Sequence, residues 1–116
     1  MNTYTNNSSN LVHLQCKPCT GATPPLSQHQ IDELLDQLDG WTLQDGTIEK
    51  TYTLTNHPHA ISFVNVVAWI SNWEDHHPQL TVGYNTVKVE YTTHAINGLS
   101  ENDFICAAKV DAQLKI

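Results

Sequence analysis

Three histidines are the residues of this chain best suited to chemistry near neutral pH. His76 and His77 are adjacent and are followed by Pro78, and His94 lies about one strand length further along. Histidine is the side chain that ordinarily both gives and takes a proton close to neutrality. Three imidazoles gathered in one pocket would therefore indicate proton-transfer chemistry or a bound metal ion.

A zinc site is the main alternative to proton transfer at these histidines. Three histidines can bind a catalytic zinc ion, but helical zinc motifs place two ligands four positions apart. Neither His76 nor His77 has such a partner. Adjacent side chains diverge by about 100° on a helix, so these two rings are poorly placed to hold one ion. We expect a metal-free site, and the clustering argues against solvated surface histidines without a function.

Composition excludes several classes of function. The chain has 116 residues, a formal charge of −7, five lysines and no arginine. It therefore lacks the basic surface that nucleic-acid recognition requires. We find no run of the roughly 18 to 20 apolar residues that span a bilayer, and the first ten residues lack signal-peptide features. Three cysteines argue against a disulfide framework. We expect a cytoplasmic protein with reduced thiols and no direct nucleic-acid or membrane partner.

Composition also divides the chain into an arm and one domain. Residues 1–25 begin with a stretch rich in Asn, Ser and Thr and end in two prolines. This composition predicts a flexible N-terminal arm without regular elements. Residues 26–116 are expected to form a single domain, because a chain of this length supports only one modest core.

Hydrophobic spacing predicts three helices and two strand pairs in that domain. The helices should begin near Ser27, His57 and Ser100, and Pro78 is expected to end the second. Alternating patterns that predict strands cover residues 41–43, 48–54, 81–84 and 87–93. The order indicates an α+β fold, αββαββα. Its four-stranded antiparallel sheet would have three helices packed on one face.

The last predicted strand indicates where His94 points. Alternate residues of a strand project from opposite faces. One set is apolar, and the other is polar and includes His94: Val87, Val89 and Tyr91 against Lys88, Glu90, Thr92 and His94. His94 should therefore project away from the core at the end of a strand, while His76 and His77 come from the end of a helix.

Together these residues resemble the signature of the pterin-4a-carbinolamine dehydratase family. The similarity extends over about residues 16–114 and includes the turn into the last helix at residues 97–104. The His-His-Pro run alone would be weak, but the combination is specific. The matching positions are Asp75, His76, His77, Pro78, Tyr84, His94 and Asp103, with Leu26, Ser27 and Trp41 similar to bacterial members.

The resemblance implies an enzyme that removes water from a 4a-hydroxytetrahydropterin. The product would be the quinonoid dihydropterin, which a reductase recycles for aromatic amino acid hydroxylases. The reaction needs a proton delivered to the C4a hydroxyl and a proton taken from N5, and two imidazoles can do both. The resemblance also implies no bound cofactor or metal, a pterin substrate, and a homodimer or homotetramer.

The resemblance also implies roles for individual residues. His76 and His94 are the candidates for general acid and base, and His77 would hold the pterin and could share the proton transfer. Asp75, Thr92 and Thr93 occupy substrate-contact positions of the family, where a carboxylate suits the donor edge of a pterin.

One departure from the family pattern and two alternative functions accompany these assignments. The family often has glutamate where this chain has Asn72, and whether the nearby Glu74 replaces it stays open. One alternative function is a non-catalytic dimerisation module, because animal members also serve a transcription factor as partners. The other is a dehydratase-like protein that acts on a different pterin.

The remaining cysteines and histidines suggest a weaker hypothesis. His13, Cys16 and Cys19 resemble half a zinc site, since the C-x₂-C spacing brings two thiolates within reach of one ion. No fourth ligand is evident. An arm with two free thiols is the preferred interpretation, and Cys106 is interpreted as a small buried residue of the last helix.

Overall fold

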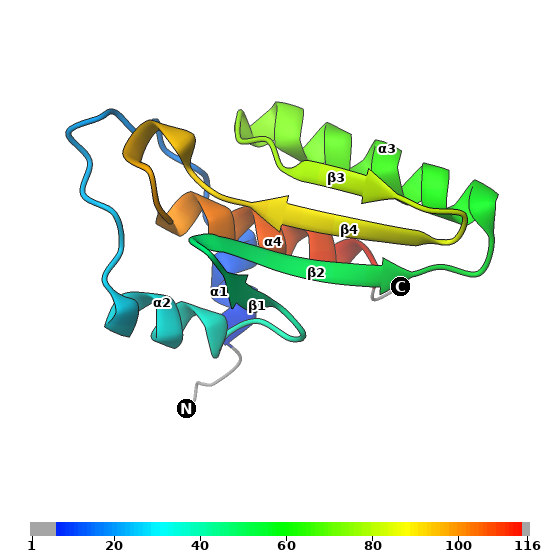
Figure 1. The fold of residues 1–116 in the computed structure, drawn as a ribbon, viewed down its shortest axis with the longest axis horizontal. Helices are drawn as coiled ribbons and strands as arrows, with labels where there is room; N and C mark the ends of the chain where they lie inside the picture. Colours follow the sequence, from blue (N-terminus) through cyan, green and yellow to red (C-terminus); the bar gives the residue numbers. More distant parts are fainter. Residues whose placement is uncertain (1–6, 115–116) are drawn as a thin grey trace.

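The computed structural model describes residues 7–114, and its centre is a four-stranded antiparallel sheet (Figure 1). The strand order is β1-β2-β4-β3, so the two longest strands lie in the middle and the two shortest at the edges. The strands are β1 (Thr42–Gln44), β2 (Thr47–Thr53), β3 (Gln79–Val82) and β4 (Thr86–Tyr91).

Alternation along the central strands gives the sheet one buried face and one polar face. In β4, Val87, Val89 and Tyr91 are fully buried, and the residues between them are partly exposed. The register pairs Ile48 of β2 with Tyr91 and Tyr52 with Val87, so the buried faces of the two strands coincide. This is the pattern expected for a sheet covered by helices on one side only.

Helices cover the buried face of the sheet. Figure 1 shows α4 (Glu101–Gln113) behind β2 and β4, and α3 (His57–Glu74), which contacts α4, along β3. The shorter α2 (Gln28–Leu35) begins with the predicted cap at Ser27 and contributes Ile31 to the core. The predicted α+β class and the order αββαββα are therefore confirmed for the domain.

The N-terminal segment differs from its prediction. We expected no regular element before residue 26, but α1 (Asn7–His13) is a helix that packs against α4. Leu11 of α1 is 2% exposed and belongs to the main core. As a result α4 is enclosed by the sheet on one side and by α1 on the other, which explains why every residue from 102 to 108 is buried. Local composition does not reveal such packing, because a polar sequence can supply a single anchoring leucine.

The end of α3 also differs from its prediction, and the difference matters for the histidines. The helix ends at Glu74, earlier than Pro78 would require, because Asp75 adopts a left-handed conformation with φ 53°. Asp is one of the few residues that tolerate this conformation. The turn carries His76 away from the helix axis, and its backbone N–H donates to the carbonyl of Ser71 (3.1 Å).

None of the helices in the described part of the chain is both long and apolar enough to cross a membrane.

Candidate active site

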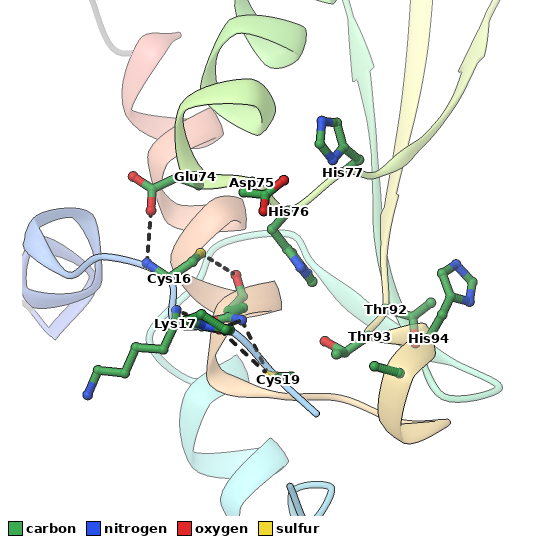
Figure 2. Close-up of a pocket in the computed structure, with 13 residues that line it drawn as sticks. Cys16, Lys17, Cys19, Glu74, Asp75, His76, His77, Thr92, Thr93 and His94 are labelled. Carbon is green, nitrogen blue, oxygen red and sulfur yellow. Dashed lines mark hydrogen bonds between the residues drawn. The ribbon is translucent and has the colours of Figure 1, made fainter. Parts of the chain in front are cut away.

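All six residues predicted for the site line one pocket of about 540 Å³ (Figure 2). Its walls come from three parts of the chain: the turn after α3, the end of β4 with the following 3₁₀ turn η1 (His94–Ile96), and the N-terminal segment before α2. The volume is within the range typical of sites for small organic ligands. The predicted residues in the lining are Asp75, His76, His77, Thr92, Thr93 and His94.

His76 is held by a buried carboxylate. Its Nε2 lies 2.6 Å from Oδ1 of Asp103, the third residue of α4, whose side chain is 0% exposed. The other oxygen of Asp103 accepts from the hydroxyl of Thr93 (2.8 Å) and from the backbone N–H of Ser100 (3.0 Å). The carboxylate therefore forms a capping box with Ser100 at the start of α4, and it also fixes an imidazole at the pocket.

This contact determines which nitrogen of His76 is free. An ionised carboxylate only accepts hydrogen bonds, so Nε2 of His76 must carry the proton that it donates to Asp103. In the neutral ring, Nδ1 is then unprotonated and able to accept a proton. The ring also stacks on Tyr91, with centroids 5.8 Å apart and planes 10° apart. Two independent contacts thus restrict its orientation.

His77 and His94 are less restrained than His76. Nε2 of His77 lies 3.0 Å from Oδ1 of Asn72, one turn back on α3, and both side chains are exposed. Asn72 is the position at which the sequence departs from the family pattern, and here its amide supports His77. His94 is exposed at the start of η1, and no hydrogen bond of its ring to another residue in the range 7–114 is found. Its imidazole is therefore available to a ligand.

The other three predicted residues, Asp75, Thr92 and Thr93, differ in their exposure and in their hydrogen-bond partners. Asp75 is exposed at the turn after α3. Thr93 is buried and belongs to the Asp103 network, where its hydroxyl lies 2.8 Å from that of Ser100. Thr92 points the other way and donates to the carbonyl of Gly46 (2.8 Å). The geometry supports a structural function for Thr93, and its direct contact with substrate stays a prediction.

Sequence reasoning missed the third wall of the pocket. Residues 16–19 and Asn102 line it, although we expected the arm to be irregular and gave it no part in the site. One sequence signal was present in Asp103, which matches a family position and caps a helix, but its pairing with His76 was not predicted. A contact between residues 27 positions apart leaves no periodic pattern in a sequence.

Glu74 and the cysteines hold the arm against the domain. Glu74 accepts the backbone N–H of Cys16 (2.8 Å) and lies 3.6 Å from the ammonium group of Lys109. Sγ of Cys16 lies 3.6 Å from Sγ of the buried Cys106. The hydrogen bond with Cys106, together with burial, raises the pKa of the Cys16 thiol well above its usual range, which favours the neutral thiol.

The half zinc site suggested by His13, Cys16 and Cys19 has no further ligand among the described residues. Cys16 pairs with Cys106, and Cys19 accepts a long hydrogen bond from Asn102 (3.5 Å). Within residues 7–114 no group of three or more Cys, His, Asp or Glu side chains is arranged to hold a metal ion.

The family model and the most similar curated relatives that we compared carry the same family description. The family described as pterin 4 alpha carbinolamine dehydratase matches residues 24–113. A protein of Nitrosospira multiformis is 60% identical, over 91% of this chain and 94% of its own length. A protein of Nitrosomonas eutropha is 55% identical, over 93% and 96%. Both bear the name "Putative pterin-4-alpha-carbinolamine dehydratase".

Two solved structures are similar in fold. One is described as a transcriptional coactivator/pterin dehydratase from Brucella melitensis; it is 32% identical, with a TM-score of 0.73, and the match covers 76% of this chain and 96% of that one. The other is a pterin dehydratase-like protein described as a RuBisCO assembly factor of the alpha-carboxysome. It is 21% identical with a TM-score of 0.55, over 65% and 87% of the two chains, and this likeness concerns the fold alone.

Proposed function

This chain belongs to the pterin 4 alpha carbinolamine dehydratase family, and on that premise we propose that it dehydrates a 4a-hydroxytetrahydropterin by histidine acid–base catalysis. The substrate loses its C4a hydroxyl and its N5 proton as water, and a C4a–N5 double bond forms. The product is the quinonoid dihydropterin. No external oxidant or reductant is needed, because the step is an elimination.

One observation carries this proposal. Three imidazoles border a single pocket, and one of them is fixed by a buried carboxylate: His76, His77 and His94, with Asp103 behind His76. A buried carboxylate that orients a histidine is a common arrangement for a group that must accept a proton in a defined direction. The proposed chemistry requires two proton-transfer groups on different sides of a small ligand.

We assign the base to His76 and the acid to His94. Nδ1 of His76 can accept the N5 proton while Asp103 stabilises the charge that develops on the ring. His94 is exposed and comes from a different element, so it can exchange protons with water and deliver one to the departing hydroxyl. His77, supported by Asn72, would hold the ring of the substrate.

Asp75 fits a contact with the donor groups of the pterin. Its side chain is an exposed carboxylate on the pocket wall, and the amino-pyrimidinone edge of a pterin carries N–H donors. Hydrogen bonds between such donors and a carboxylate are stronger than those between neutral groups. This interaction would orient C4a and N5 toward the histidines.

Self-association is part of the proposal. The outer face of α3 has two stacked tryptophans, Trp69 and Trp73, which are 66% and 73% exposed. Ile61 and Val66 on the same helix are also exposed. A helix that buries one apolar face in its own core and exposes another is expected to pack on a second copy. We propose a homodimer or homotetramer formed through α3.

The adaptor function is the alternative, and the same face of α3 favours it. The similar Brucella melitensis protein is described both as a transcriptional coactivator and as a dehydratase. An adaptor would use the tryptophan face and would tolerate loss of the histidines. A dehydratase would not.

A dehydration assay tests the proposal. Chemically generated 4a-hydroxytetrahydrobiopterin loses water slowly by itself, and the purified protein should accelerate this loss in stopped-flow absorbance traces. The variant His94→Gln should lose most of the acceleration. The variant His29→Ala is a matched control, because His29 is highly exposed on α2 and outside the pocket. Equal rates with and without protein, for several side chains at C6, would reject the dehydratase and leave the adaptor.

A further inference from the structure

The segment Cys16–Cys19 forms one wall of the active-site pocket although it precedes the part of the chain that the family description matches. The family match begins at residue 24, whereas residues 16–19 contribute four of the lining residues. Figure 2 shows this segment crossing the pocket on the side opposite His77 and His94. This segment therefore adds a wall to the pocket that the three histidines border.

Besides the contacts of Cys16 with Glu74 and Cys106, the side chain of Asn102 on α4 holds this segment at Lys17 and Cys19. The amide of Asn102 accepts the backbone N–H of Lys17 (2.9 Å) and donates to the carbonyl of the same residue (2.6 Å). This two-point contact imitates the pairing of one peptide group with another. The same amide lies 3.5 Å from Sγ of Cys19, and the backbone carbonyl of Asn102 accepts from Cys16.

The position of Asn102 links the arm to the catalytic network. Asn102 is 7% exposed and directly precedes Asp103, whose carboxylate holds His76. Glu74, which accepts the backbone N–H of Cys16, directly precedes the turn that carries His76. The arm thus contacts Glu74, two residues before His76, and Asn102, one residue before Asp103.

We propose that Asn102 is a positioning residue that holds Pro18 and Cys19 against the bound pterin, so that the arm is part of the substrate site. The proposal rests on the proposed function, because it specifies where the substrate of that reaction lies. The proposed elimination uses His76 and His94 for both proton transfers, so the arm is assigned to binding and to the exclusion of water. Its loss should weaken binding more than it slows the chemical step.

Labelling of Cys19 tests the contact directly. Cys19 is partly exposed, so iodoacetamide should alkylate it, and fragment-ion mass spectrometry distinguishes it from Cys16. Saturating 7,8-dihydrobiopterin, whose binding is followed separately by fluorescence, should slow this alkylation at least about threefold. Unchanged alkylation at saturation would overturn the inference and leave the proposed function intact. No pterin binding at all would overturn both.

Two variants of Asn102 test its positioning function. Asn102→Ala removes both bonds to Lys17. Asn102→Asp keeps an acceptor for the Lys17 N–H but places a carboxylate oxygen against the Lys17 carbonyl, and the far-UV circular dichroism of each variant shows whether it is folded. Each should raise KM about tenfold, the equivalent of about one lost hydrogen bond, while kcat changes less than about threefold. Each should also speed alkylation of Cys19.

A matched control separates this effect from general destabilisation. Gln113→Ala removes a carboxamide from the exposed last turn of the same helix, outside the pocket, and should leave KM and the alkylation rate unchanged. A loss of kcat at unchanged KM in folded Asn102→Asp would overturn the inference, because it would place the function of Asn102 in the chemical step.

Discussion

Asp103 and His76 form a 2.6 Å contact between a fully buried carboxylate and an imidazole at the edge of the pocket. The two residues belong to the ends of different helices, since His76 follows α3 and Asp103 lies in the first turn of α4. The same carboxylate also accepts from Thr93 and Ser100. The contact thereby joins the end of α3 to the beginning of α4, and it orients His76, the proposed base.

The variant Asp103→Asn should therefore lose activity with little change in substrate binding. Asparagine cannot balance the positive charge on His76 in the transition state, and its amide can turn an N–H toward the ring. We expect kcat to fall about 10²-fold, within the range of single acid–base contributions. Steady-state kinetics measure the effect, and a melting temperature well above the assay temperature shows that the variant is folded during the assay.

Asp111 provides the control for that variant. It is the other buried carboxylate of α4, and it accepts hydrogen bonds from Trp41 (3.0 Å), Lys50 (2.9 Å) and Tyr52, away from the pocket. Asp111→Asn should lower the free energy of unfolding by about 1–3 kcal/mol and keep kcat. A similar loss of kcat in both variants would mean that Asp103 acts only through stability.

The histidine variants should show that His76 and His94 act as one unit. His76→Gln keeps a donor for Asp103 but has no base, and His94→Gln removes the proposed acid. Each should lower turnover by about 10²- to 10⁴-fold. The double variant should lose much less than the product of the two, because groups in one proton-transfer step are not additive. His77→Ala should mainly raise KM. Wild-type turnover of the double variant would contradict the acid–base assignment.

Removal of metal ions should leave the activity unchanged. The proposed elimination uses imidazoles as acid and base, and among residues 7–114 no metal-binding cluster is found. We expect the turnover after exhaustive EDTA treatment to match that of untreated protein. The Cys16→Ala variant removes one ligand of the separate zinc site considered at Cys16 and Cys19. Its metal content should be measured by mass spectrometry. Stoichiometric zinc in that variant would contradict the metal-free site.

Disruption of the tryptophan face should reduce the size of the oligomer. Trp69→Glu places a charge on the exposed face of α3, where Trp69 stacks on Trp73 at 5.5 Å. Light scattering at micromolar concentration should show a smaller species than the wild type. Tyr84→Ser is the control, because Tyr84 is at least as exposed as Trp69 but lies in the β3–β4 turn. A monomeric wild-type protein would contradict self-association.

Alkaline pH should destabilise the protein through two buried tyrosines and the Cys16 thiol, whose pKa values are all raised in the folded state. Burial raises the pKa of Tyr52 and of Tyr91 well above the ordinary value of 10.0, with Asp111 adding to the effect at Tyr52 and Cys106 at Tyr91. Above pH 10 the unfolded chain therefore loses protons that the folded chain keeps, and stability falls as pH rises. The slope is about 1.4 kcal/mol per pH unit for each tyrosine.

Urea unfolding at pH 8, 10 and 11 measures how the free energy of unfolding depends on pH. A step of about 1 pH unit changes this free energy enough to be resolved. Tyr52→Phe should lose about a third of the alkaline slope, because Tyr91 and the Cys16 thiol, whose pKa values are also raised, supply the rest. The variant is less stable at neutral pH because Asp111 loses a partner. Tyr84→Phe, at an exposed position, should retain the full slope. An unchanged slope in Tyr52→Phe would contradict the prediction.

The sequence by itself determined the features that depend on short segments. The alternation of Val87, Val89 and Tyr91 predicted the buried face of β4, and it did so because a strand shows its environment every second residue. Ser27 and Ser100 predicted where two helices begin. The combination of Asp75, the His-His-Pro run, Tyr84, His94 and Asp103 indicated the family, and the resemblance implied six of the residues that line the pocket. Their catalytic functions stay predictions.

Only the tertiary structure decided how distant segments meet. Three contacts join residues that are 27 to 90 positions apart in the sequence. They are the hydrogen bond of His76 with Asp103, that of Asn102 with Lys17, and the contact of Cys16 with Cys106. None of these contacts repeats along the chain, so none leaves a period that a sequence pattern can reveal. For the same reason α1 was missed. A short polar helix is stable here because Leu11 packs into a core built by other segments.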